Sequence, residues 1–299
     1  MNWILISVIA AFFQNLRSGI QKNLNKNISL VASTYVRFMF SLPFAALIFF
    51  FYFNGFEQLT ILLQQKTFLI YVISGSLAQI FFTFVLLYSF QFSNFIVGTT
   101  LSKTEVVQIS ILETLLFQDH FNNLTILGIV ISTIGVIIFS TKDKQVLINN
   151  LISKSTVIGL FCGFLLALSV VCYRGATLHL EVLSNNFDKA LSTLFLAVVF
   201  QSIIMTIYIF IFEKEQFKKM YEHKQQCLLA GLSGFLATIS WFYAFTIMQA
   251  AIVRAVGQVE LLFSYIASRY YFKEKIKIEE IIGILIFVLG VLIILTTKL

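Results

Sequence analysis

The chain has 299 residues, of which 59% are apolar and 12% charged, and its mean hydropathy is +0.90. A soluble protein has roughly a quarter of its residues charged, so this composition excludes a soluble globular fold. The net charge of +7 is scattered over short connectors, which is typical of membrane topology signals and not of a nucleic-acid-binding face. We therefore expect an all-α integral membrane protein whose surroundings are the lipid bilayer.

Ten apolar runs of 18–24 residues are each long enough to cross the membrane as a helix, since ~20 residues at 1.5 Å per residue span ~30 Å of hydrocarbon. They lie at residues 3–21, 30–53, 68–90, 95–117, 124–141, 155–178, 190–212, 227–248, 250–272 and 278–297. Pro43 lies in the middle of the second run and removes one backbone hydrogen bond there, so we expect a kink.

The chain contains one segment twice, at an offset of 155 positions. The offset places Tyr88 on Tyr243, Glu105 on Glu260, Phe117 on Phe272, Gly128 on Gly283 and Gly135 on Gly290 without a gap. A polar break at 142–154 then separates a first unit, 1–141, from a second, 155–299. Each unit has five predicted helices, an odd number, so the second enters the membrane from the opposite side as an inverted repeat.

Lysine placement gives an orientation for these helices. Twelve lysines lie in the connectors on one side of the predicted bundle and three on the other. The positive-inside rule then places both termini outside the cytoplasm. The paired glycines, seven residues apart in each unit, are expected to let the fifth helix of each unit approach a neighbour closely.

Charged residues divide by type between spans and connectors. All five arginines lie inside predicted spans, whereas fifteen of sixteen lysines lie in connectors. A charge inside the membrane is costly unless it is paired or hydrated, and arginine offers a planar fork that suits carboxylate or phosphate. The candidates for substrate binding or gating are Arg17, Arg37, Tyr88, Lys103, Arg174, Trp241, Tyr243, Arg254 and Gln258.

Opposite insertion of the two units predicts two mixed-charge clusters at different depths. One holds Arg17, Arg37, Lys103 and Glu105, and the other Arg174, Arg254 and Glu260. Both a role in substrate binding or gating and purely structural pairing remain open for these clusters. Glu105 and Glu260 are the candidates for proton coupling, because a desolvated carboxylate can change protonation when a site opens; the alternative is permanent neutralisation by the arginines.

The sequence has no motif for enzymatic chemistry. There is no glycine-rich phosphate loop and no nucleophile elbow, and His120, His179 and His223 are isolated. The three cysteines have no metal-binding spacing and are interpreted as packing residues. We expect no enzyme activity, no catalytic residues, no cofactor and no metal.

The two five-helix units, Arg37 in its TYVRFMFSLPFAAL helix, and the acid-then-GxxxxxxG ending of each unit resemble the EamA group of the drug/metabolite transporter superfamily. The endings are Phe117-Gln-Asp119 before Gly128 and Gly135, and Phe272-Lys-Glu274 before Gly283 and Gly290. The resemblance implies a bundle around a central cavity, alternating access and small organic cargo such as amino acids, in a bacterial inner membrane. Two features depart from it: the fourth and ninth spans lack a proline that many members carry, and the first has Arg17 and no acid.

The leading hypothesis is a secondary transporter of a small carboxylate-bearing metabolite, above all an amino acid whose ammonium group meets Glu105 or Glu260. It predicts that Arg174→Ala and Glu260→Gln abolish flux without loss of folding. The alternatives are an anion exchanger for phosphorylated or nucleotide-linked compounds and a scaffold protein without saturable flux. The sequence leaves the direction of transport, the coupling ion and the oligomeric state open.

Overall fold

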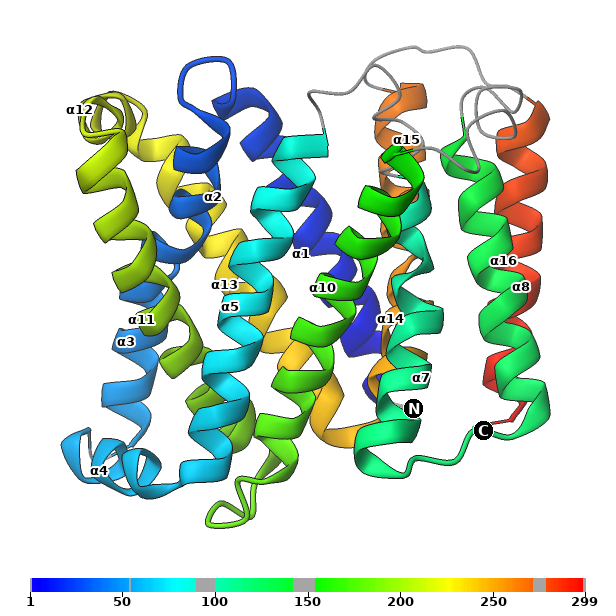
Figure 1. Ribbon diagram of the computed structural model, residues 1–299, viewed down its shortest axis with the longest axis horizontal. Coiled ribbons are helices and arrows are strands. Elements are labelled where there is room, and N and C mark those ends of the chain that lie inside the picture. Colours follow the sequence, from blue (N-terminus) through cyan, green and yellow to red (C-terminus); the bar gives the residue numbers. More distant parts are fainter. Residues whose placement is uncertain (1, 54, 90–99, 142–153, 271–277, 298–299) are drawn as a thin grey trace. The chain divides into compact units, whose positions relative to one another are not determined.

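The computed structural model describes residues 2–53, 55–89, 100–141, 154–270 and 278–297, and these residues form helices and no strands (Figure 1). The helices are α1 (Asn2–Leu24), α2 (Leu30–Met39), α3 (Leu42–Tyr52), α4 (Phe56–Gln64), α5 (Lys66–Ser89), the 3₁₀ turn η1 (Ser102–Thr104), α7 (Glu105–Phe117), α8 (Asn123–Ser140), α10 (Lys154–Leu178), α11 (Asn186–Phe212), α12 (Glu215–Glu222), α13 (Lys224–Ile247), α14 (Ala250–Gly257), α15 (Glu260–Tyr270) and α16 (Ile278–Thr296).

Eight stretches of the described chain are long and apolar enough to cross a membrane. They correspond to eight of the ten predicted spans, with α2 and α3 together forming the second. The predicted span 250–272 is divided into α14 and α15, which are separated at Gln258 and Val259. The predicted span 95–117 lies partly outside the described residues, and its described part contains η1 and α7. The all-helical membrane architecture is thus confirmed, while the count of ten remains a prediction.

The chain forms two compact units that both draw on the two halves of the sequence. Unit 1 comprises residues 1–4, 81–171 and 248–299, and unit 2 comprises residues 5–80 and 172–247. The domain boundaries predicted from the repeat, 1–141 and 155–299, remain a prediction about the sequence. The connector between them lies, except for Lys154, outside the described residues.

Within unit 1, the repeat-equivalent helices α8 and α16 run antiparallel in direct contact (Figure 1). A Cβ added at Gly135 would lie 2.3 Å from Phe287 N, and one added at Gly290 would lie 2.3 Å from Ser132 N. The 155-residue offset exchanges these contacts, because Gly135 corresponds to Gly290 and Ser132 to Phe287. The close approach predicted for the paired glycines is therefore confirmed, and each helix packs on its own repeat equivalent.

The contacts of the other two glycines, Gly128 and Gly283, are exchanged by the same 155-residue offset. A Cβ at Gly128 would lie 2.7 Å from Ile294 Cγ1, and one at Gly283 would lie 2.6 Å from Phe139 N. Phe139 and Ile294 are again 155 positions apart. Two antiparallel helices whose contacts are exchanged in this way are related by a local two-fold axis that runs across them.

Within unit 2, the second span is broken between α2 and α3. Pro43 lies in the first turn of α3, where its missing N–H has no helical partner to lose. The kink predicted at Pro43 is confirmed as a break at Phe40 and Ser41. Gly231 of α13 packs directly against this break, because a Cβ there would lie 2.4 Å from Phe40 O.

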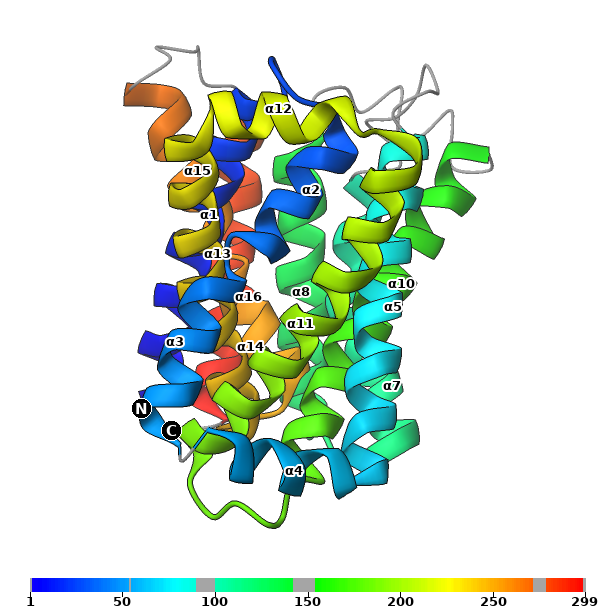
Figure 2. The same cartoon turned by 90° about the vertical axis from the view of Figure 1, so that its left-hand side faces the viewer.

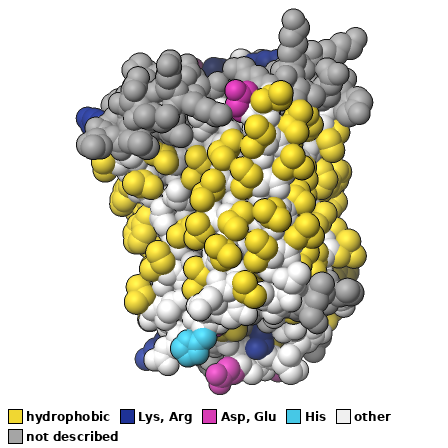
Figure 3. Space-filling model, turned by 90° about the vertical axis from the view of Figure 1, so that its right-hand side faces the viewer, with side chains coloured by type: hydrophobic (Ala, Val, Ile, Leu, Met, Phe, Trp, Pro, Cys, Tyr) yellow, Lys and Arg dark blue, Asp and Glu magenta, His cyan; other side chains and the backbone are white. Residues whose placement is uncertain are grey.

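The described helices present apolar side chains to the outside. On α8 and α16, exposed residues include Leu124, Leu127, Leu285, Leu289 and Leu292. Figure 3 shows hydrophobic side chains over the middle of one face and charged side chains toward its ends. The short helix α12, in unit 2, runs across the direction of its neighbours α11 and α13 (Figure 2). This distribution suits a protein surrounded by lipid, with polar connectors at the membrane surfaces.

Candidate functional site

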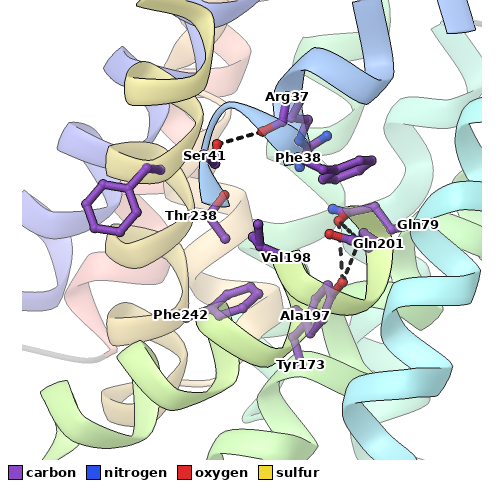
Figure 4. A pocket seen from close by; sticks show the side chains of 11 residues that line it. Arg37, Phe38, Ser41, Gln79, Tyr173, Ala197, Val198, Gln201, Thr238 and Phe242 are labelled. Carbon is purple, nitrogen blue, oxygen red and sulfur yellow. Dashed lines mark hydrogen bonds between the residues drawn. The ribbon is translucent and has the colours of Figure 1, made fainter. Parts of the chain in front are cut away.

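A pocket with polar and aromatic walls lies within unit 2 (Figure 4). Its lining residues are Arg37, Phe38, Ser41, Gln79, Tyr173, Ala197, Val198, Gln201, Phe235, Thr238 and Phe242. Arg37 is the one permanently charged side chain among them. The cavity volume is about 10 Å³, roughly the space that one water molecule needs. An organic ligand therefore requires the pocket to widen.

Three uncharged polar side chains from different helices form one wall of this pocket (Figure 4). Gln201 Nε2 on α11 donates to Gln79 Oε1 on α5 at 2.7 Å and lies 2.9 Å from Tyr173 OH on α10. Tyr173 OH also lies 3.4 Å from Gln79 Oε1 and 3.2 Å from Ser76 Oγ. Gln201 and Tyr173 are each 2% exposed. Buried groups that hold one another in this way keep a fixed orientation.

Arg37 lies in the last turn of α2, at the edge of the helix break. The break leaves carbonyl groups without helical partners, and the Ser41 hydroxyl lies 2.6 Å from Arg37 O and 2.7 Å from Gly231 O. A helix C-terminus favours a nearby cation, and the guanidinium carbon is 5.3 Å from the centre of the Phe38 ring, within cation–π range. The break thus fixes a positive charge at the pocket wall.

The other predicted site residues of unit 2 do not line this pocket. Arg17, Arg174 and Trp241 are 6%, 7% and 6% exposed. Trp241 Nε1 donates to Gln14 Oε1 at 3.0 Å, as expected of a buried indole. Arg174 directly follows Tyr173 of the pocket, whereas Tyr243 is half-buried on α13. A role of these residues in binding or gating remains a prediction.

Unit 1 contains a cluster of paired charges. Glu105 forms an ion pair with Arg254, with side chains 2% and 9% exposed. Lys103 Nζ lies 3.2 Å from Glu260 Oε1, and these side chains are 29% and 14% exposed. Gln258 Nε2 donates to Lys103 O at 3.5 Å. Both carboxylates predicted for proton coupling are therefore matched with cations.

This pairing corrects the two clusters expected from the sequence. The sequence predicts Glu105 beside Lys103 and Arg254 beside Glu260, but each acid pairs with the cation of the other predicted cluster. The reason is the local two-fold relation. Gln258 and Lys103 are repeat equivalents, 155 positions apart, and they touch each other. Residues beside such an axis lie close together, whichever copy they come from.

Glu113 is a structural carboxylate that the candidate set did not include. It is 0% exposed, and its two oxygens accept hydrogen bonds from Ala250 N at 2.7 Å and Ala251 N at 2.9 Å. These are the first backbone donors of α14, the helix that carries Arg254. A carboxylate at a helix N-terminus satisfies unpaired N–H groups and is favoured by the helix dipole.

Sequence reasoning also missed Gln79, Tyr173 and Gln201. Two of them are amides in the middle of apolar runs, SLAQIFF and VVFQSII. An amide is costly to bury without a partner, so both glutamines could be recognised from the sequence although neither carries a charge. The side chain of the candidate Tyr88 lies outside the part of the chain that the structure describes. The described residues contain no group of His, Cys, Asp and Glu that could hold a metal ion.

Comparisons with known proteins agree with the fold. The sequence profile of the EamA-like transporter family matches residues 1–141 and 158–296. A search of curated proteins found no match. Among 28 matching chains of solved structures, one described only as a crystal structure of a protein covers 99% of this chain and 98% of its own, with a TM-score of 0.71 and 9% identity. At that identity the likeness shows the fold alone.

The family match spans nearly the whole chain in two stretches, and the apolar helices described above account for a multi-pass membrane protein. The resemblance seen in the sequence is thereby confirmed. The chain belongs to the EamA-like transporter family, and it is a membrane transporter of small molecules.

Proposed function

We propose that the protein is a secondary active transporter that moves a small carboxylate-bearing metabolite, an amino acid or a related acid, by alternating access. The observation that carries this proposal is Arg37, a permanent positive charge on the wall of a pocket whose other lining residues are uncharged. A ligand carboxylate complements this charge and can accept two parallel hydrogen bonds from the guanidinium group.

The amount of charge in the pocket favours a carboxylate over a phosphate. A phosphate ester carries up to about two negative charges near neutral pH. No second lysine or arginine belongs to the pocket lining. The proposed exchange of phosphorylated or nucleotide-linked compounds therefore has weaker support than transport of a monoanion.

Alternating access follows in this proposal from the two repeats. The α8–α16 contact is symmetric between the two repeats. It can therefore persist when the two repeats exchange conformations during alternating access, while the rest of each repeat moves. Glu105 and Glu260 remain the candidates for coupling to protons. Protonation of either would release a cation, Arg254 or Lys103, from its ion pair.

The proposal also includes a place in the cell. Positive connectors on one side favour termini outside the cytoplasm, and the resemblance stated above favours a bacterial inner membrane. Labelling of a cysteine added at either terminus with an impermeant reagent in intact cells would show the orientation.

A thermal-stabilisation screen of purified protein tests the function. A ligand that binds only the folded state adds RT ln(1 + [L]/Kd) to stability, about 2.7 kcal/mol at a hundred-fold excess over Kd. We expect amino acids or organic acids to raise the unfolding midpoint, and Arg37→Gln to remove that rise. Stabilisation by phosphorylated compounds alone would favour the anion exchanger. Saturable uptake of the same ligand into proteoliposomes would exclude the hypothesis of a scaffold protein without transport activity.

A further inference from the structure

The walls of the unit 2 pocket define more than a preference for negative charge. We propose that the cargo is an organic acid whose second polar group is an uncharged hydroxyl or carbonyl, and that the pocket rejects the ammonium group of an amino acid. This inference rests on the proposed function, because it assigns a narrower substrate class to the same pocket.

The acidic residues of unit 2 are absent from the pocket wall. An ammonium group buried without a negative partner is costly, and no Asp or Glu lines the pocket. All acidic residues of unit 2 lie in connectors or in helix ends, and they are Glu57, Glu181, Asp188, Glu213, Glu215 and Glu222. The lining of this pocket therefore offers no carboxylate to a cationic ligand group.

The two acids expected to meet an ammonium group are already paired with cations. Glu105 pairs with Arg254 and Glu260 with Lys103, all within unit 1. An ammonium group would have to displace a guanidinium or a lysine from these pairs. Because the charges of the unit 1 cluster are balanced, the cluster should bind an amino acid no more tightly than an acid without an ammonium group.

The positive charge of Arg37 also acts on the rest of a bound ligand. When the guanidinium group holds a carboxylate, a substituent on the adjacent carbon lies within a few ångströms of the same positive charge. An ammonium group there is repelled, since like charges interact unfavourably in a low-dielectric site. A hydroxyl or keto oxygen carries no such charge and can accept a hydrogen bond instead.

The polar wall provides suitable partners for such an oxygen. Amide and phenol groups both donate and accept hydrogen bonds, and Gln79, Gln201 and Tyr173 present both types at fixed positions. The aromatic residues Phe38 and Phe242 also line the pocket, with the Phe242 ring 4.6 Å from that of Tyr173. The part of the ligand between its carboxylate and its second polar group would then be apolar. Such a ligand suits the usual composition of a binding site, which is mostly apolar with a few polar groups.

Matched ligands test the inference with the full-length protein in detergent. The pairs are lactate against alanine and 3-phenyllactate against phenylalanine, which differ only by hydroxyl against ammonium, with 2-phenylethylamine as the cation. We expect each hydroxy acid to bind at least about tenfold more tightly than its amino acid, equivalent to about 1.4 kcal/mol, and 2-phenylethylamine not to bind. Kd values come from the ligand dependence of the unfolding midpoint.

Three variants assign the preference to named groups. Arg37→Gln should abolish binding of both hydroxy acids, and Arg37→Lys should keep part of it, because lysine retains the charge but not the fork. Gln201→Leu should weaken 3-phenyllactate and leave 3-phenylpropionate, which has no hydroxyl, unchanged. The matched control is Lys218→Gln, which removes an exposed lysine of α12 in the same unit. This control variant should bind both hydroxy acids as the parent protein does.

The outcomes separate this inference from the proposed function. Amino acids that bind as tightly as their hydroxy acids, or more tightly, would overturn the inference and keep transport of carboxylates. A preference for hydroxy acids that survives Arg37→Gln and Gln201→Leu would also overturn it, because the selective groups would lie elsewhere. No binding of any carboxylate, together with no uptake, would overturn the proposed function itself.

Discussion

Charged side chains have different surroundings in the cluster of unit 1 and in the pocket of unit 2. In unit 1 each cation of the cluster faces a carboxylate, so that Arg254 and Lys103 are neutralised by Glu105 and Glu260. In unit 2 the pocket sets Arg37 among amides, a phenol and phenyl rings, with no acid in its lining. A charge inside a membrane protein is costly in either setting. The comparison indicates that matched charges hold the helices together, while a positive charge at an uncharged pocket suits a negative ligand.

The largest effect should come from breaking the buried pair of unit 1. Glu105→Gln leaves Arg254 buried, with its carboxylate partner removed. Removal of one partner of a buried pair costs about 3–5 kcal/mol, whereas replacement of both partners is much less harmful. We therefore expect a lower unfolding midpoint in a denaturing-detergent titration, with much of the loss recovered in Glu105→Gln/Arg254→Gln. Equal losses in the single and double variants would contradict a structural pair.

The glycine contact of unit 1 should be the next most sensitive. A Cβ at Gly135 or Gly290 would meet backbone nitrogen at 2.3 Å, so alanine forces α8 and α16 apart, at about 1–3 kcal/mol for an overpacked contact. Because the two positions are exchanged by the repeat, Gly135→Ala and Gly290→Ala should cost nearly the same. The control is Gly19→Ala, where an added Cβ meets nothing within 4 Å. Unequal unfolding midpoints for the two variants would argue against the local two-fold relation.

The smallest stability effect should come from the more exposed pair. Lys103 and Glu260 have side chains 29% and 14% exposed, and pairs with access to solvent contribute about 1 kcal/mol or less. Lys103→Gln should therefore shift the unfolding midpoint far less than Glu105→Gln does. If Lys103→Gln and Glu105→Gln lose flux to the same degree, the two ion pairs act as one coupling element. If Lys103→Gln transports normally, any role of Glu260 in transport does not require its ion pair with Lys103.

How much the sequence revealed depended on whether a feature was local. The membrane spans and the break at Pro43 follow from composition and backbone chemistry along one segment. The repeat and its paired glycines follow from a comparison of two segments of the sequence. The ion pairs do not follow from the sequence, because residue spacing places a side chain along its own span but not beside a side chain of another span. Lys103 contacts its repeat equivalent Gln258 because both lie beside the local two-fold axis. Residue spacing in the sequence does not give the position of that axis.

The pocket illustrates the same limit. Arg37 was recognised as a candidate because an arginine inside an apolar run is conspicuous. Its companions Gln79, Tyr173 and Gln201 come from three other helices, and their alignment depends on helix rotation within unit 2. The periodicity of apolar residues is a poor predictor of helix rotation when lipid surrounds the helices, because the inward and outward faces of each helix are then both hydrophobic.

Arg37 is the residue that we propose to hold the carboxylate of the cargo. The most direct test is the rate of saturable carboxylate uptake into proteoliposomes by Arg37→Gln, with Lys218→Gln as the charge-matched control. We predict a fall in kcat/KM of at least about tenfold, or about 1.4 kcal/mol of lost interaction, for Arg37→Gln at an unchanged unfolding midpoint, and parental uptake for the control. Parental uptake by a folded Arg37→Gln variant would contradict the claim.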